Sequence, residues 1–162
     1  MGGVVRRISD SLNAVAMAAL FLLIAAMIVV ITLQVVARVW FTALSWTEEA
    51  SRYLLVWSSM IGASIGVKRG SHIAVTFVVG LLPGLMQKIV GVVMAVLACG
   101  FFAAGVFYGT ELFNRTVFQT SPALELPMRY VYLAIPLSSG IMLVHGLSAL
   151  LETLGAPSRE VK

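Results

Sequence analysis

The sequence predicts an all-α integral membrane protein with four transmembrane helices, and two observations support this fold class. The chain of 162 residues is 60% hydrophobic and only 11% charged, whereas a soluble domain carries about 25% charged residues. Its apolar runs are long and continuous instead of alternating, so they indicate helices and exclude a membrane β-barrel. The single cysteine, Cys99, leaves no disulfide or metal cluster within the chain.

The four predicted spans lie at residues 12–37, 46–67, 89–108 and 130–151 of a single membrane domain, residues 1–162. The first run exceeds the roughly 7–15 residues of a signal-peptide core, so it is expected to be a retained helix. The uncharged part of the second run is too short to span alone. Glu48, Glu49 and Arg52 are therefore expected in the headgroup layer, where they should be paired. Pro136 is expected to kink the fourth span.

Two connections have distinct characters. Residues 72–82 are apolar but too short to span, so they predict an interfacial or re-entrant helix that ends at Pro83. Residues 110–129 form the longest polar stretch, and they predict a periplasmic loop.

The charge distribution predicts the orientation of the chain. One side carries mostly basic residues, namely Arg6, Arg7, Lys68, Arg69, Lys88, Arg159 and Lys162 against Asp10, Glu152 and Glu160. The other side is neutral, with Arg38, Arg52, Arg115 and Arg129 against Glu48, Glu49, Glu111 and Glu125. By the positive-inside rule both termini are cytoplasmic. The net charge of +4 is thus a topology signal and not a sign of nucleic-acid binding.

A charge cluster lies at the start of the second span. It comprises Arg38, Glu48, Glu49 and Arg52, next to Trp46. Glu48 and Glu49 lie four and three residues before Arg52, so either can pair with it, and Arg38 could reach the same carboxylates. Two interpretations remain open: a structural cluster that stabilises the hairpin, or a carboxylate left over for a partner subunit. No ionisable residue lies near the centre of a span, so the chain is not expected to be the conducting element.

The glycine pairs and the two histidines each allow more than one interpretation. Gly62 with Gly66, and Gly105 with Gly109, fit the helix-packing pattern, either within the chain or against a partner. The second span ends in a basic cytoplasmic rim. Its residues are Lys68, Arg69 and His72. His72 and His145 could ligate haem, as an alternative to interfacial roles. No catalytic residue, metal site or other cofactor is predicted.

The chain resembles the small membrane subunit of tripartite ATP-independent periplasmic (TRAP) transporters, the DctQ-type small permease. The resemblance rests on Arg38, the stretch W-T-E-E-A-S-R at residues 46–52, Tyr53 and Trp57, Gly62-Ala63, and H-I-A-V at residues 72–75 before Leu82-Pro83. Thr76 stands where family members often carry an acidic residue, which leaves a charge contact at that point in doubt.

The resemblance implies a non-catalytic subunit of the bacterial inner membrane. Its partners would be the lipid bilayer, a large permease subunit, and a periplasmic solute-binding protein that the loop could help receive. The complex would take up an organic acid, a carboxylate, using a sodium gradient, and this subunit would brace the large one. The alternatives are a haem-binding anchor of a respiratory enzyme and a free-standing small transporter.

Overall fold

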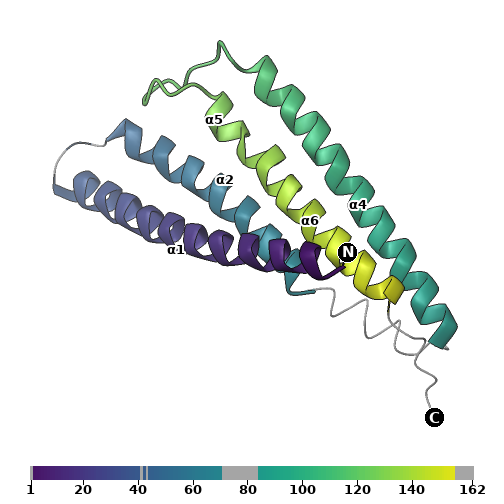
Figure 1. The fold of residues 1–162 in the computed structure, drawn as a ribbon. Helices are drawn as coiled ribbons and strands as arrows, with labels where there is room; N and C mark the ends of the chain where they lie inside the picture. Colours follow the sequence, from purple (N-terminus) through teal and green to yellow (C-terminus); the bar gives the residue numbers. More distant parts are fainter. Residues whose placement is uncertain (1, 41, 43, 71–83, 156–162) are drawn as a thin grey trace.

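The computed structural model describes residues 2–40, 42, 44–70 and 84–155, and within them the chain is all-helical (Figure 1). The elements are α1 (Gly2–Trp40), α2 (Ser45–Lys68), α4 (Gly84–Arg115), the short α5 (Arg129–Tyr132) and α6 (Ala134–Gly155). In these residues the only β-type pairing is one isolated bridge between Thr120 and Pro127. The predicted all-α class is confirmed.

Among the described residues, three helices are long and apolar enough to cross a membrane. They are Gly3–Trp40, Met86–Arg115 and Arg129–Leu154, the last of which includes α5 and α6. At about 1.5 Å per residue, the 39 residues of α1 exceed a hydrocarbon core of about 30 Å. Residues 2–11, which precede the predicted first span, also belong to α1.

Helix α2 is not among these three, so the four predicted spans are not confirmed. It has 24 residues, which is long enough. Its first two turns, however, carry Glu48, Glu49 and Arg52, and its remainder is rich in serine and glycine. That α2 is a fourth span remains a prediction, as does the cytoplasmic position of the termini.

The polar loop is shorter than the sequence predicts. Helix α4 continues to Arg115, so residues 110–115 are helical and the loop comprises residues 116–128. These polar residues were predicted to lie in a loop, but they are compatible with a helix because the side-chain contacts of Thr110, Glu111 and Arg115 follow helical spacing. Thr110 donates to the carbonyl of Val106, and Arg115 pairs with Glu111 one turn earlier.

The fourth predicted span is interrupted near its start. Helix α5 ends at Tyr132 and α6 begins at Ala134, with Leu133 between them. Pro136 has no N–H to donate to the carbonyl of Tyr132, so the regular ladder is broken at the predicted place. The backbone bond from Leu137 to Leu133 carries the chain across the break. The predicted interfacial segment, residues 72–82, lies outside the described residues, and so does His72.

Helix α6 lies between α4 on one side and the α1–α2 pair on the other (Figure 1). The core between α1 and α2 is small. Ala16, Ile61 and Ile65 are buried there, and Ala19, Leu20, Leu23 and Trp57 pack around them. The outer faces of α1 and α4 expose large apolar side chains, such as Phe21 at 74% and Phe101 at 75%. These faces fit lipid or a membrane partner and not water.

Candidate functional site

The first turn of α2 orients the charged motif. The helix begins at Ser45, and Thr47 holds the turn because both its hydroxyl and its N–H donate to the carbonyl of Leu44, at 2.7 and 3.2 Å. Thr47 is fully buried. Neighbouring residues of a helix diverge by about 100°, so Glu48 and Glu49, which follow it, face different surroundings.

Glu48 makes the ordinary helical ion pair. Nη2 of Arg52 donates to Oε1 of Glu48 at 3.2 Å, four residues apart. Both side chains are about two-thirds exposed. An exposed pair of this kind contributes well under about 1 kcal/mol, so it does not organise the fold.

Glu49 is buried and binds the backbone of a distant loop. Only 8% of the residue is exposed. Its Oε2 accepts the N–H of Leu124 at 2.9 Å and the N–H of Ala123 at 3.2 Å. Hydrogen bonds to an ionised acceptor are stronger than neutral ones. One carboxylate thus joins the start of α2 to the loop between α4 and α5.

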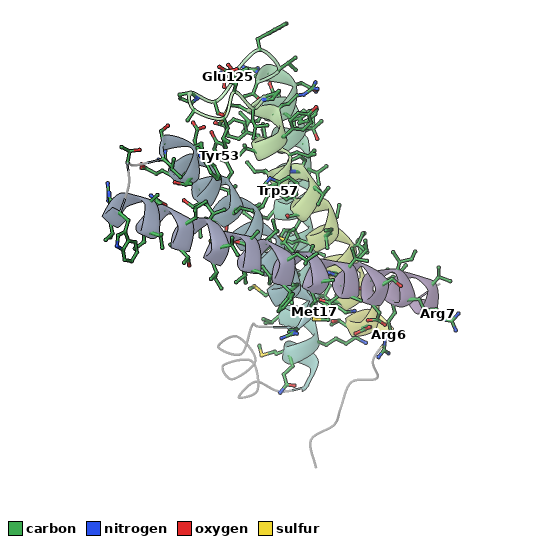
Figure 2. The ribbon with its side chains drawn as sticks, turned by 90° about the vertical axis from the view of Figure 1, so that its left-hand side faces the viewer. Arg6, Arg7, Met17, Tyr53, Trp57 and Glu125 are labelled. Carbon is green, nitrogen blue, oxygen red and sulfur yellow. The ribbon has the colours of Figure 1, made fainter. Side chains whose placement is uncertain are left out.

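That loop, residues 116–128, is ordered by its own hydrogen bonds and is called the α4–α5 loop below. Ser121 donates its N–H to the carbonyl of Leu126 at 2.9 Å, and Met128 donates to Gln119 at 2.8 Å. Glu125 has a φ of 51°, a left-handed conformation that closes the turn. Figure 2 shows Tyr53 of α2 below the loop that carries Glu125, with Arg6 and Arg7 at the far end of α1.

The other predicted members of the cluster do not join this contact. Arg38 is exposed at the end of α1, and among the described residues no ion pair joins it to Glu48 or Glu49. Trp46 is 37% exposed. The sequence does not predict that the α4–α5 loop binds Glu49. The adjacency of the two acids was the available signal, because both cannot face Arg52 equally well.

A second polar cluster, here called the terminal cluster, lies at the other end of the bundle. It consists of Ser9, Asp10, Lys68 and His145. Lys68 Nζ lies 2.9 Å from Oδ1 of Asp10 and donates to the hydroxyl of Ser9 at 2.7 Å. The same hydroxyl lies 2.8 Å from Nδ1 of His145. Ser9 is fully buried and His145 is 2% exposed. The cluster therefore joins α1, α2 and α6.

Lys68 and Arg69 of the predicted basic rim differ in their surroundings. Lys68 points into the bundle, whereas Arg69 is exposed, and its nearest polar contact is the sulfur of Met17 at 3.2 Å. His145 Nδ1 is engaged with Ser9, and its Nε2 is buried with no hydrogen-bond partner among the described residues. The suggested haem pair of His72 and His145 cannot be measured, because His72 lies outside the described part of the chain.

The predicted packing glycines differ in their surroundings. A Cβ atom at Gly105 would lie 2.6 Å from the Ser139 hydroxyl, and one at Gly109 would lie 2.9 Å from Pro136. Both glycines therefore allow α4 to approach α6 closely. A Cβ atom at Gly62 would be 3.9 Å from Leu20 of α1, which is ordinary contact. Gly66 is half-buried on α2.

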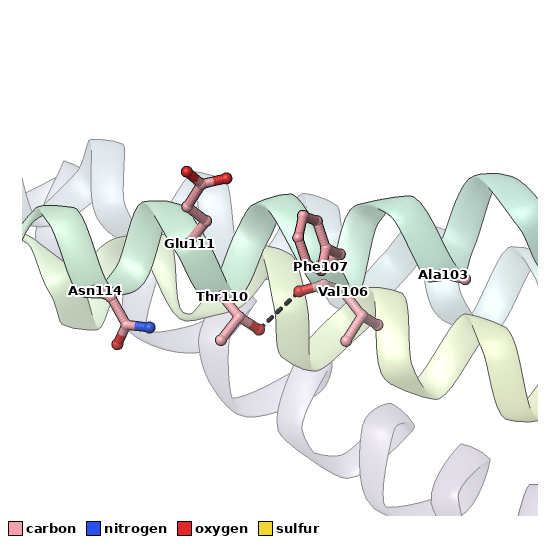
Figure 3. A pocket seen from close by; sticks show the side chains of 6 residues that line it. All are labelled: Ala103, Val106, Phe107, Thr110, Glu111 and Asn114. Atoms are coloured by element: carbon pink, nitrogen blue, oxygen red, sulfur yellow. Dashed lines mark hydrogen bonds between the residues drawn. The ribbon is translucent and has the colours of Figure 1, made fainter.

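A hollow on the surface of α4 has no features of a binding pocket. Its lining residues all come from one face of that helix, as Figure 3 shows, and they are Ala103, Val106, Phe107, Thr110, Glu111 and Asn114. The hydroxyl of Thr110 is already bonded to Val106. Within the described residues, no group of three or more His, Cys, Asp or Glu side chains is placed to hold a metal ion.

Comparison with known proteins decides what kind of subunit carries these clusters. The DctQ component of tripartite ATP-independent periplasmic transporters matches residues 27–156. The chain belongs to this family. The matched residues of this chain include Glu49, the α4–α5 loop, Lys68 and His145. They do not include Ser9 and Asp10, which precede residue 27.

Curated relatives agree with the DctQ assignment. The chain is 34% identical over 101 residues to the isethionate TRAP transporter permease protein DctMQ of Oleidesulfovibrio alaskensis, covering 61% of this chain and 16% of that protein. It is 33% identical over 103 residues to the C4-dicarboxylate TRAP transporter small permease protein DctQ of Rhodobacter capsulatus, covering 61% and 44%. It is 25% identical over 135 residues to the sialic acid TRAP transporter small permease protein SiaQ of Vibrio cholerae, covering 82% and 77%.

The matched part of the chain therefore spans less than half the length of the first two relatives. The chain is a small subunit of a TRAP transporter and a membrane protein, and its family is a transport component and not an enzyme.

Proposed function

We propose that this small subunit braces the large permease subunit of a TRAP transporter in the bacterial inner membrane. The complex takes up an organic acid by sodium symport after a periplasmic binding protein has delivered it. The observation that carries the bracing role is the placement of charge. The candidate spans carry Asp, Glu, Lys and Arg only toward their ends, while large apolar side chains are exposed between them.

This distribution favours a scaffold over a conducting element. Ion-coupled transporters bind their substrates and ions near the middle of the membrane, at polar groups and broken helices. The interruption at Leu133 lies next to the α4–α5 loop and so toward one end of the bundle. The exposed apolar faces of α1 and α4 offer surface on which a second membrane protein can pack.

The relatives support the identity of the partner and limit the substrate. The isethionate relative is a longer permease protein of which this chain matches 16%, which fits a small subunit fused to a large one. The three relatives are named for isethionate, C4-dicarboxylates and sialic acid. The substrate class that we propose is therefore an organic acid, and we expect the large subunit and the binding protein to determine which organic acid is taken up.

Co-isolation and uptake test the proposal together. The tagged chain, purified from native membranes in mild detergent, should bring down one multi-span membrane protein in constant ratio. The pair, reconstituted with its binding protein, should accumulate substrate only with an inward sodium gradient. A monodisperse homo-oligomer, or uptake by this chain alone, would overturn the bracing role. A haem Soret band in the purified chain would instead support the anchor alternative.

A further inference from the structure

One apolar side chain of the α4–α5 loop is almost completely exposed. Phe118 is 97% exposed, and Val117 beside it and Leu126 across the turn are partly exposed as well. The loop is not free to fold over this ring, because its backbone is bonded to itself and to Glu49. A fixed, fully exposed phenylalanine indicates a surface that is covered in the native setting.

The Glu49 contact sets the position of the loop along the bundle. Since Glu49 directly follows the first turn of α2, the loop backbone at Ala123 and Leu124 is level with the start of that helix. Trp46 is the second residue of α2, and Trp40 is the last residue of α1. Both tryptophans are exposed, Trp40 at 70%.

The exposed aromatic side chains at this end come from four different elements. They are Trp40 of α1, Trp46 of α2, Phe118 of the loop, and Tyr130 of α5. The guanidinium of Arg129 lies 4.9 Å from the centre of the Tyr130 ring. Aromatic side chains gathered at one end of apolar helices, with arginine beside them, are typical of the level where acyl chains meet headgroups.

We propose that the α4–α5 loop is a lipid-interface anchor, with Phe118 inserted at the headgroup–acyl boundary of the leaflet at this end of the bundle and Glu49 holding the loop at that depth. The occupant of this surface is thus phospholipid. The inference requires only that the chain is embedded in a membrane. It stands apart from the bracing role, so the two can fail separately.

A nitroxide probe measures the depth of position 118 directly. In a Cys99→Ala background, which removes the one cysteine of the chain, Phe118→Cys is spin-labelled and the full chain is placed in nanodiscs of phosphatidylethanolamine and phosphatidylglycerol. Ala123→Cys is the matched control, because Ala123 is exposed on the same loop. The label at 118 should collide with a water-soluble nickel chelate several-fold less often than the label at 123, and with oxygen more often.

Two results would overturn the proposal. Equal access of the nickel chelate to both positions would place Phe118 in water. Shielding of position 118 from both reagents, in the isolated chain or in the co-purified complex, would mean that a protein covers it. Glu49→Gln should raise nickel access at 118, whereas Glu48→Gln should not. If neither variant changes the access, Glu49 does not set the depth.

Discussion

Replacing Gly109 with alanine should destabilise the packing of α4 on α6, whereas the same change at Gly100 should not. An added Cβ at Gly109 would lie 2.9 Å from both Cδ and the backbone nitrogen of Pro136, and 3.0 Å from Cγ2 of Ile135. The proline ring is fixed to the backbone and cannot rotate away. At Gly100, on the same helix, nothing lies within 4 Å of the added atom.

The two substitutions share one favourable contribution, so their difference isolates the clash. Glycine to alanine in a compatible helix stabilises by about 0.4–1 kcal/mol, and overpacking a close contact costs about 1–3 kcal/mol. Gly100→Ala should therefore be neutral or stabilising. Gly109→Ala should be less stable than Gly100→Ala by about 1–3 kcal/mol, which corresponds to roughly 2–4 °C in melting temperature for each kcal/mol.

Thermal unfolding in mild detergent, followed by the fluorescence of the native tryptophans, measures this difference without any partner. A Gly109→Ala variant that melts at or above the temperature of Gly100→Ala would refute the reasoning. Gly109 would then be free of α6, and its small-residue pattern would be available to another protein. The expected result instead assigns Gly109 to packing within the chain.

Four further outcomes test the polar clusters. Glu49→Gln should increase proteolysis of the α4–α5 loop, because the charged acceptor is lost, whereas Glu48→Gln should not; equal cleavage would contradict the Glu49 contact. Lys68→Met should lower the melting temperature more than Arg69→Met, since only Lys68 binds Asp10 and the buried Ser9. Alanine at both Glu48 and Glu49 should abolish transport by weakening assembly. A double variant that stays fully complexed but loses sodium dependence would place these acids in ion coupling. Tyr53→Phe should increase proteolysis of the loop less than Glu49→Gln does, because it removes one donor to Glu49 and the 3.5 Å contact with the Met128 sulfur while both backbone donors to Glu49 remain.

The sequence predicts the helices well, because long apolar runs are local signals. It is less reliable at helix ends. Polar residues 110–115 were assigned to a loop, yet ion pairs and hydroxyl bonds at helical spacing keep them in α4. The interruption before α6 was foreseen because Pro136 removes a hydrogen-bond donor, which is also a local effect.

The clusters depend on contacts that the sequence does not contain. Ser9 and His145 are 136 positions apart, and Glu49 is 75 positions from Leu124. A serine or a backbone amide gives no recognisable signal in a sequence. The motif therefore indicated Glu48, Glu49 and Arg52, but it did not indicate the loop backbone that binds Glu49. Because neighbouring residues of a helix point in different directions, the sequence could show that Glu48 and Glu49 have different surroundings. It could not show that the α4–α5 loop binds one of them.

The Glu49 contact and the terminal cluster both involve α2, the least apolar of the long helices. Ser58, Ser59 and Ser64 each donate a hydroxyl to a carbonyl three residues earlier, so these polar groups are satisfied without water. Glu49 attaches one end of α2 to the α4–α5 loop, and Lys68 attaches the other to α1. A helix whose hydroxyls are satisfied internally and whose ends are both fixed can lie across a bilayer between two apolar neighbours. This supports α2 as the fourth span, and it gives the charges at both ends of that helix a structural role.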